Sequence, residues 1–308
     1  MQKIVVTGAT SMIGVALIEE AIKNHVKVLA IVRENSKRLE RLPKSELIHV
    51  LSCDIGKLNS ISQIKDTYDV FYHFAWNYTD KNGRNDSVLQ TKNINTTLDA
   101  VNLAHNLKCR KFIGAGSQAE YGKIQGIISP NTHINPEVPY GIAKYAAGQL
   151  SLKLCEQYGM DCVWGRIFSV YGCFDNEGTM LNYAIDRFIQ GKSAEFSAAT
   201  QMWNYLNEHD AGRAFYLLGK TKNAKGIYCI AHPQSRPLKN YITELREIFG
   251  NSAECRFAQL NTELVGLDAD VSKLINDTGF CPQVSFTDGM KELIEYRRSH
   301  RKKEGVNL

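Results

Sequence analysis

The stretch Val5-Val-Thr-Gly-Ala-Thr-Ser-Met-Ile-Gly14 decides the fold of this chain. A run of β-branched residues leads into a turn bracketed by Gly8 and Gly14, and a helical pattern follows over residues 13–24. Such a turn places the free N–H groups of a helix N-terminus where a pyrophosphate binds in nucleotide-binding sheets. The same residues also suit a plain strand–helix connection, and Ser11 stands where the usual fingerprint has its middle glycine.

Outward from this turn, short apolar runs alternate with amphipathic patterns, which predicts an α/β fold with a doubly wound parallel sheet. We expect strands over residues 3–7, 27–33, 47–52, 70–74, 111–115, 162–168 and 226–230. We expect helices over residues 13–24, 61–67, 87–107, 140–158, 180–190, 238–249 and 287–298. After about residue 171 the strands become shorter. This change predicts a main domain over residues 1–170, to which the chain returns at about 203–231, and a smaller C-terminal lobe over residues 171–202 and 232–308.

Composition excludes several classes of protein. Of 308 residues, 44% are hydrophobic and 22% are charged, as is usual for soluble globular proteins. No apolar stretch is long enough to cross a bilayer and no leader precedes the first strand, so we expect a cytoplasmic protein with no membrane partner. The eight cysteines are scattered, which argues against a metal site or a disulfide framework. Residues 297–304 hold +4 of the net charge of +5 without interleaved aromatic residues, so we do not expect nucleic-acid binding.

A tyrosine and a lysine form the second informative feature, in the run Pro139-Tyr-Gly-Ile-Ala-Lys144. Residues four apart on a helix share one face, so we expect the Lys144 ammonium to lie beside the Tyr140 phenol. A neighbouring ammonium lowers the pKa of a phenol, which can then pass a proton near neutral pH. Tyr140 is therefore a candidate general acid/base beside a nicotinamide.

The end of the second expected strand indicates which dinucleotide binds. Residues 33–38 read Arg-Glu-Asn-Ser-Lys-Arg, a cationic loop with a hydroxyl group that suits a 2′-phosphate, so NADP is favoured. An exposed basic loop explains the same residues, and Glu34 keeps NAD as the alternative because a carboxylate binds the ribose hydroxyl of NAD. Asp54, just past the third strand, can accept a hydrogen bond from adenine or cap a helix.

Several runs resemble one family, and they occur in that family's order: Thr7-Gly-Ala-Thr-Ser-Met-Ile-Gly14, Asp54-Ile55, His73-Phe-Ala-Trp76, Asn93-Ile-Asn95, Gly116-Ser-Gln-Ala-Glu-Tyr-Gly122, Tyr140-Gly-Ile-Ala-Lys144, Arg166-Ile-Phe-Ser-Val-Tyr-Gly172 and Asp270-Val-Ser-Lys273. The chain resembles the extended short-chain dehydrogenase/reductases, the NAD(P)-dependent nucleotide-sugar epimerases, dehydratases and reductases, over about residues 2–298. The resemblance implies a Rossmann-type domain that binds NADP and a lobe that binds substrate. It also implies a homodimer formed through helices 87–107 and 140–158.

The resemblance and the patterns above together give candidate site residues. The catalytic candidates are Ser117, Tyr140 and Lys144. The cofactor-binding candidates are Gly8, Thr10, Ser11, Met12, Ile13, Gly14, Arg33, Ser36, Arg38, Asp54, Ile55, Phe74, Ala75, Trp76, Asn93, Tyr140, Lys144, Ile167 and Ser169. The substrate-binding candidates are Ser117, Gln118, Ser169, Met180, Trp203 and Arg236, although Trp203 suits the core of the lobe equally well.

The run after Ser117 bears on the reaction. Dehydratases of this family carry a Glu two residues after the catalytic Ser or Thr, whereas this chain has Ala119 there and its carboxylate, Glu120, one residue later. Along an extended segment that displacement turns the side chain to the other side, so we interpret Glu120 as a carboxylate that fixes the loop. A dehydratase is therefore disfavoured. The run resembles that of members that reduce CDP- or dTDP-linked 4-keto-deoxy sugars, such as CDP-abequose synthase.

We therefore expect NADPH-dependent reduction of the 4-keto group of a CDP-, dTDP-, GDP- or UDP-linked deoxy sugar, for polysaccharide or glycan precursor synthesis. The alternative is an NAD-dependent nucleotide-sugar 4-epimerase, which is redox-neutral overall. A non-catalytic NADP-binding sensor is a third interpretation, but such a protein would be expected to lose the pair Tyr140 and Lys144.

Overall fold

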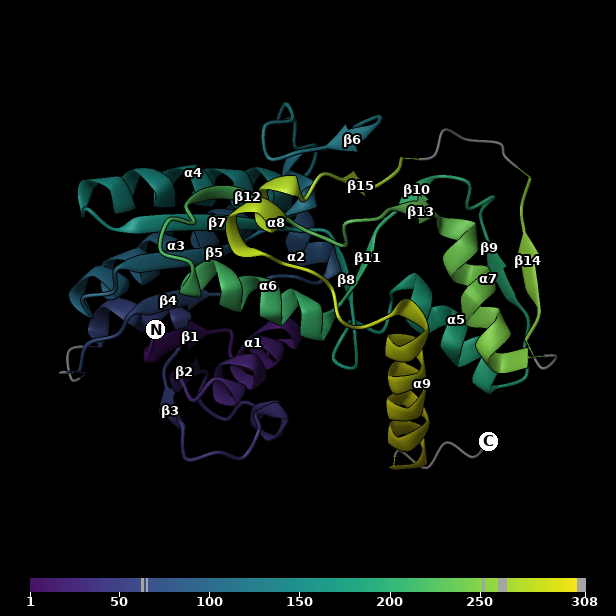
Figure 1. Ribbon diagram of the computed structural model, residues 1–308, viewed down its shortest axis with the longest axis horizontal. Helices are drawn as coiled ribbons and strands as arrows, with labels where there is room; N and C mark the ends of the chain where they lie inside the picture. The colour runs from purple at the N-terminus through teal and green to yellow at the C-terminus, as the bar shows by residue number, and fades with distance from the viewer. Residues whose placement is uncertain (62–63, 65, 251–252, 260–264, 304–308) are drawn as a thin grey trace.

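A computed structural model describes residues 1–61, 64, 66–250, 253–259 and 265–303 (Figure 1). Its centre is a seven-stranded sheet with strand order β12-β7-β5-β4-β1-β2-β3, and every pairing in it is parallel. The strands are β1 (Lys3–Thr7), β2 (Lys27–Val32), β3 (Ile48–Ser52), β4 (Val70–His73), β5 (Lys111–Ser117), β7 (Asp161–Ile167) and β12 (Gly226–Ile230). The strand order reverses between β1 and β4, which is where doubly wound folds bind ligands. The expected α/β fold is confirmed.

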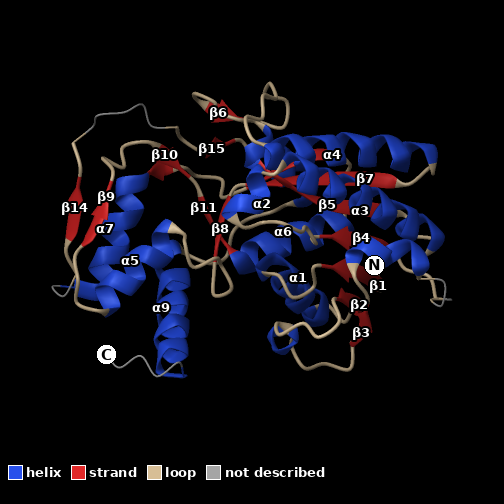
Figure 2. Ribbon diagram, turned by 180° about the vertical axis from the view of Figure 1, so that it is seen from behind, coloured by secondary structure: helices blue, strands red, loops and turns tan. Residues whose placement is uncertain are grey.

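Helices cover both faces of this sheet (Figure 2). The helices α1 (Met12–Lys23) and α6 (Glu208–Lys220) pack on one face, and α3 (Ser87–Asn106) and α4 (Pro139–Gln157) pack on the other. Successive side chains of a strand point to opposite faces. In β1, Ile4 and Val6 accordingly join the core under α1 and α6, while Val5 joins the core under α3. A strand buried on both faces reads as the continuous apolar run seen in the sequence.

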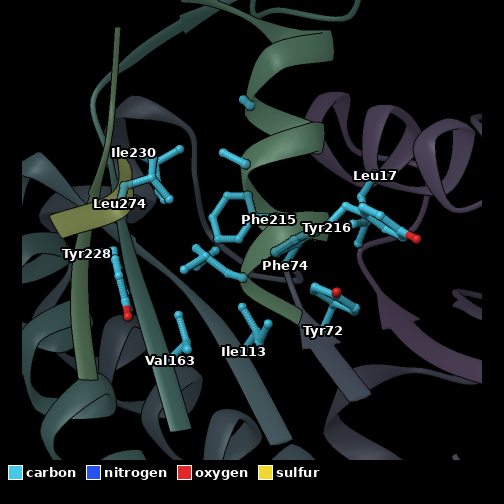
Figure 3. Close-up of a cluster of buried hydrophobic side chains, with 14 of the residues drawn as sticks. Leu17, Tyr72, Phe74, Ile113, Val163, Phe215, Tyr216, Tyr228, Ile230 and Leu274 are labelled. Carbon is cyan, nitrogen blue, oxygen red and sulfur yellow. The ribbon is translucent and has the colours of Figure 1, made fainter. Parts of the chain in front are cut away.

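The helix α6 was not expected from the sequence. Its buried residues include Glu208, Asp210 and Gly212, which are polar or small, so the stretch lacks a simple apolar stripe. Figure 3 shows Phe215 of this helix among other buried side chains, which include Phe74, directly after β4, and Ile113 of β5. The helix therefore belongs to the main core, although its sequence lacks the apolar periodicity that would have predicted it.

The chain also returns to this core near its end. The short helix α8 (Ser272–Thr278), likewise not expected, follows β15 (Asp268–Ala269). Leu267, Leu274 and Phe280 are buried in the same cluster as the residues of the sheet and α6. The segment around α8 therefore packs on the main sheet rather than on the helices of the lobe.

The smaller lobe lies at one end of the main sheet (Figure 1). Its core joins α5 (Met180–Ile189), α7 (Leu238–Phe249) and α9 (Phe286–Lys303). Among the described residues, four two-stranded sheets accompany the main one: β8 (Ser169–Tyr171) with β11 (Tyr205–Asn207), β9 (Ala194–Phe196) with β14 (Cys255–Phe257), β10 (Met202–Trp203) with β13 (Arg236–Pro237), and β6 (Ile127–Ile128) with β15.

The described part of the chain also holds short helices: α2 (Lys81–Asn85) and the 3-10 helices η1 (Leu39–Arg41), η2 (Ile55–Ser60) and η3 (Gln118–Glu120). Part of the helix expected over residues 61–67 lies outside the described residues, and η2 ends just before it. Within the described part of the chain, no helix is long and apolar enough to cross a membrane. All eight cysteines are free thiols.

Candidate active site

The turn after β1 brings backbone atoms together at the carboxyl end of the sheet. Gly8 has φ +68°, and a Cβ atom there would lie 2.6 Å from the backbone nitrogen of Ala75. Ser11, in place of the fingerprint glycine, caps α1, and its Oγ accepts a hydrogen bond of 3.1 Å from the Gly14 N–H. The amides of Met12 and Ile13 lie in the first turn, where backbone N–H groups have no partner within the helix. The turn, which also holds Thr10, is thus open to an anion at the helix N-terminus.

A cavity of about 780 Å³ lies beyond the ends of β2 and β3. Its lining includes Arg33, Glu34, Ser36, Lys37, Arg38 and Asp54. Asp54 also caps η2, because its Oδ1 accepts a hydrogen bond of 2.8 Å from the Gly56 N–H. The Ile55 side chain is buried in the core rather than in the cavity. The basic loop predicted from the sequence therefore lines this cavity, while its residues other than Ser36 stay exposed.

The three catalytic candidates lie together at the same edge of the sheet. Ser117 ends β5, and Tyr140 is in the first turn of α4. The two side chains are close enough for the Ser117 hydroxyl to lower the pKa of Tyr140. One turn further along α4, the buried Lys144 Nζ donates a hydrogen bond of 2.7 Å to the Ala115 carbonyl oxygen of β5. A phenol, a hydroxyl and an amine thus converge within one short section of β5 and α4.

Burial dominates the electrostatics of this group. Burial lowers the pKa of Lys144 to about 7, although Glu120 nearby acts in the opposite direction. Burial raises the pKa of Tyr140, while the Arg84 guanidinium and the Ser117 hydroxyl lower it. On balance the pKa of Tyr140 is therefore raised, whereas the sequence led us to expect that the neighbouring Lys144 ammonium would lower it. The Lys144 Nζ lies 5.9 Å from the Tyr140 ring centroid, which is further away than the guanidinium of Arg84.

Two residues of the segment after β4 surround the tyrosine and the lysine. The Lys144 Nζ lies 3.7 Å from the Trp76 ring centroid, and the Trp76 ring meets the Tyr140 ring edge-on at 6.1 Å. The Arg84 guanidinium lies 4.1 Å from the centroid of the Tyr140 ring. Sequence reasoning placed Trp76 here but missed Arg84, because α2 is a short polar segment without hydrophobic periodicity. The only feature of the sequence that indicates this helix is Asp80, which caps it.

Glu120 holds the loop that carries Ser117. Its Oε1 accepts hydrogen bonds from the Ser117 N–H at 2.8 Å and the Trp164 Nε1 at 2.9 Å. Its Oε2 lies 2.7 Å from the Arg166 Nε in a buried ion pair. The interpretation of Glu120 as a carboxylate that fixes the loop is confirmed.

Other cofactor candidates form the support of the site. The Asn93 amide bonds both backbone groups of Asn77, at 2.9 Å and 3.0 Å, and so fixes the loop that follows Trp76. Phe74 faces the core and packs on Phe215, with 4.8 Å between ring centroids. Ile167 ends β7 and is partly buried against the main core. Ser169, which begins β8, pairs in register with Tyr205.

The substrate candidates do not all line one cavity. Met180 lines a cavity of about 580 Å³ between α5, β9 and α7, with Tyr183, Phe196 and Leu238 among its other walls. Trp203 and Arg236 pair across β10 and β13. The Arg236 guanidinium is ion-paired with Glu244 at 2.5 Å. Gln118, half-buried, follows Ser117 directly.

Comparison with known proteins agrees with this geometry. Residues 4–231 match the NAD dependent epimerase/dehydratase family. The chain therefore belongs to this family, and it is an enzyme of the NAD(P)-dependent extended short-chain dehydrogenase/reductase type.

Three of the matching proteins are informative. A UDP-glucose epimerase of Bacillus subtilis, described as uncharacterised, is 24% identical over 96% of this chain and 98% of its own length. A dTDP-6-deoxy-L-talose 4-dehydrogenase (NAD(+)) of Aggregatibacter actinomycetemcomitans is 30% identical over 46% of this chain and 51% of its own. The solved UDP-N-acetylglucosamine 4-epimerase of Methanobrevibacter ruminantium, in complex with UDP-N-acetylmuramic acid, has a TM-score of 0.85 at 20% identity and covers 97% of this chain and 99% of that one.

Proposed function

We propose that this enzyme uses NADPH to reduce the 4-keto group of a CDP-, dTDP-, GDP- or UDP-linked deoxy sugar, as a step in glycan precursor synthesis. The observation that carries the proposal is the cavity of about 780 Å³ beyond β2, which Arg33, Ser36 and Arg38 help to line. Guanidinium and hydroxyl groups suit a 2′-phosphate, which NADPH has and NADH lacks. Cells keep a reductant supply as NADPH, whereas an epimerase needs no net reductant.

The residues of the site fit a dinucleotide. The turn at Gly8 has no side chain to block a close approach, and a Cβ atom there would meet the backbone at 2.6 Å. The first turn of α1 offers N–H groups to the pyrophosphate. The cavity beyond β2 lies at the same edge of the parallel sheet as the turn and Ser117, since all three follow the carboxyl ends of strands. Arg33, Arg38 and Asp54 would hold the adenosine end there.

The residues near β5 and α4 would handle the proton of the reaction. When bound, the nicotinamide supplies the hydride that reaches C4. Ser117 and Tyr140 hydrogen-bond the 4-keto oxygen, and Tyr140 gives up its phenolic proton as that oxygen gains negative charge. Lys144, in its protonated form, stabilises the phenolate that remains. Solvent then returns a proton to Tyr140.

The environment of Glu120 argues against dehydration. Removal of a proton from C5 requires a free carboxylate near the sugar. Glu120 is fully buried, and both of its oxygens are occupied by Ser117, Trp164 and Arg166. Gln118 and Ala119, which occupy the neighbouring positions, carry no carboxylate. These observations support chemistry confined to C4.

A nucleotide-sugar 4-epimerase is the second candidate. The names of the Bacillus relative and of the Methanobrevibacter structure favour it. The name of the Aggregatibacter relative, a 4-dehydrogenase, favours oxidation or reduction at C4 instead. The two candidates share their proton chemistry and differ in whether reductant is consumed.

One experiment separates these candidates. The purified protein is incubated with NADPH or NADH and a panel of CDP-, dTDP-, GDP- and UDP-linked 4-keto-deoxy sugars, and loss of reduced cofactor is followed by absorbance. In parallel, UDP-sugars with a 4-hydroxyl group are incubated without reductant, and inversion at C4 is followed by NMR. We expect stoichiometric loss of NADPH and no inversion. Inversion without loss of reductant would establish the epimerase and reject the reductase.

We also propose that the protein forms a homodimer through α3 and α4. Three apolar side chains on these helices are largely exposed: Val88 at 71%, Ile142 at 52% and Leu150 at 46%. Light scattering coupled to size-exclusion chromatography should give a dimer for the natural chain and a monomer for Ile142→Glu combined with Leu150→Glu. A natural chain that elutes as a monomer at all concentrations would reject the dimer.

A further inference from the structure

Arg84 is a cation placed over the ring of the proposed acid/base. Its guanidinium carbon lies 4.1 Å from the Tyr140 ring centroid. The phenol of the same tyrosine lies near the Ser117 hydroxyl, which lowers its pKa, and Trp76 meets the ring edge-on. A cation over an aromatic face is attracted by the electrons of the ring. The attraction is stronger when the phenol is ionised, because the ring then shares a full negative charge.

The short helix that carries Arg84 is fixed by hydrogen bonds. The Asp80 carboxylate caps α2 by accepting from the Asn82 and Gly83 N–H groups, each at 3.1 Å. The buried Gln90 amide donates to the carbonyl oxygens of Gly83 and Tyr78, each at 2.9 Å. Gly83 lies so close to Tyr78 that a Cβ atom there would be 2.8 Å from the Tyr78 Cβ. The backbone that carries the guanidinium is therefore held firmly against the loop after β4.

The charges that face Tyr140 leave Arg84 as its main cationic neighbour. Glu120, from η3, is paired with Arg166. Lys144, on the same helix as Tyr140, is buried, and its ammonium donates to the Ala115 carbonyl oxygen rather than to the phenol. Among the described residues, no carboxylate forms an ion pair with Arg84, so its charge is not neutralised by a neighbouring side chain. A guanidinium stays charged at every pH at which the protein is folded.

We propose that Arg84 is a positioning residue that acts through Tyr140, holding the ring in place and stabilising its phenolate form. The inference rests on the proposed function in one respect, namely that Tyr140 exchanges a proton with the substrate oxygen. In the reduction, the O–H bond of Tyr140 breaks, a new O–H bond forms on the substrate oxygen, and the phenolate carries the negative charge. The Arg84 charge lies where that negative charge appears, and it acts whether or not Lys144 is protonated.

The test measures the ionisation of Tyr140 directly, without any substrate. The protein is prepared with tyrosine isotopically labelled at the ring carbon that bears the hydroxyl group, and the Tyr140 resonance is assigned from its loss in Tyr140→Phe. The resonance is titrated with pH in the natural chain, in Arg84→Gln and in Arg84→Lys. The matched control is Lys81→Gln, which removes an exposed cation from the same short helix.

The expected result is that Arg84→Gln raises the Tyr140 titration midpoint by about 1–3 pH units, the usual effect of a cation within ~4–6 Å. Arg84→Lys should restore part of the shift, and Lys81→Gln should leave the midpoint unchanged. The proposal is overturned if Arg84→Gln titrates like the natural chain or if Lys81→Gln shifts the midpoint equally. It is also overturned if Tyr140 of the natural chain stays protonated until the protein unfolds.

Kinetics provide a second readout. Arg84→Gln should lower kcat and move the pH profile of kcat, with little change in the affinity for NADPH. A purely structural role would change both affinity and stability without moving the pH profile. If the natural chain shows the expected titration but reduces no nucleotide sugar, the proposed function fails and this inference stands. If it reduces sugars but the titration does not respond to Arg84, the inference alone fails.

Discussion

The carboxylate of Glu120 and the guanidinium of Arg166 form an ion pair in which both side chains are almost fully withheld from water, at 0% and 1% exposure. The Arg166 guanidinium also lies 4.5 Å from the centroid of the Tyr121 ring. Because Glu120 accepts the Ser117 N–H as well, the pair ties the end of β7 to the loop that positions a catalytic candidate. The same buried ion pair therefore contributes to the stability of the protein and to the position of Ser117.

Glu120→Gln should destabilise the protein by about 3–5 kcal/mol, because it leaves the Arg166 charge buried without a counter-ion. The free energy of unfolding from urea titration measures the effect. Adding Arg166→Met should recover part of the loss, since the double variant buries no unpaired charge. If the double variant were less stable than Glu120→Gln, the ion pair would not be the source of the loss.

Tyr140→Phe should lower kcat by about 10²–10⁴-fold, the usual effect of losing a general acid. Affinity for NADPH should stay nearly the same, because the ring remains. Tyr145→Phe, a half-buried tyrosine later on the same helix, is the matched control. A Tyr140→Phe enzyme within a few-fold of the natural rate would remove Tyr140 from the proposed role.

How much of the fold the sequence predicts depends on where its buried residues lie. The strands at residues 3–7 and 226–230 match residue for residue, because strands buried on both faces are continuous apolar runs with clear ends. The helix α6 was missed because Glu208 and Asp210 are buried in its first turn. The Asp210 carboxylate accepts hydrogen bonds from the backbone N–H groups of Gln283 and Val284, and no local sequence pattern predicts such a long-range contact.

The residues of the site were likewise only partly predictable from the sequence. Ser117 and Tyr140 were found because they belong to motifs, and the structure brings them together at the end of β5 and the start of α4. Arg84 was missed because its position depends on Gln90, a buried amide that a sequence pattern does not distinguish from any polar residue of a helix. The sequence led us to expect a lowered pKa for Tyr140, whereas burial, which helical spacing does not reveal, dominates the pKa values of both Tyr140 and Lys144. The position of Arg84 and the burial of Tyr140 and Lys144 depend on long-range contacts, which local periodicity does not reveal.

Arg33→Gln should reduce the affinity for NADPH at least about tenfold, or ~1.4 kcal/mol, and leave the affinity for NADH nearly unchanged. The reason is that a guanidinium lining the cavity beyond β2 contributes to binding of the 2′-phosphate alone. Glu34→Gln is the matched control, and it should raise the preference for NADPH because it removes a carboxylate from the same cavity. Titration of both cofactors at one ionic strength measures the ratio. Equal losses for the two cofactors would show that Arg33 does not recognise the 2′-phosphate.

His209 joins the main domain to the lobe and should make stability depend on pH. Its Nδ1 lies 3.3 Å from Glu19 of α1, and its Nε2 lies 3.3 Å from Glu292 of α9. The hydrogen bond to Glu19 and the contact with Glu292 raise the pKa of His209 to about 9, against the effect of burial. The folded state therefore binds the proton more tightly than the unfolded chain does.

A raised folded-state pKa gives a stabilisation that is complete below the unfolded value of about 6.5 and is lost as pH rises to about 9. His209→Gln should therefore lower the urea midpoint clearly at about pH 6 and much less at about pH 10. His49→Gln, which removes an exposed imidazole on β3, is the control. A deficit of His209→Gln that is equal at both pH values would mean that the imidazole stabilises the junction by packing rather than by charge.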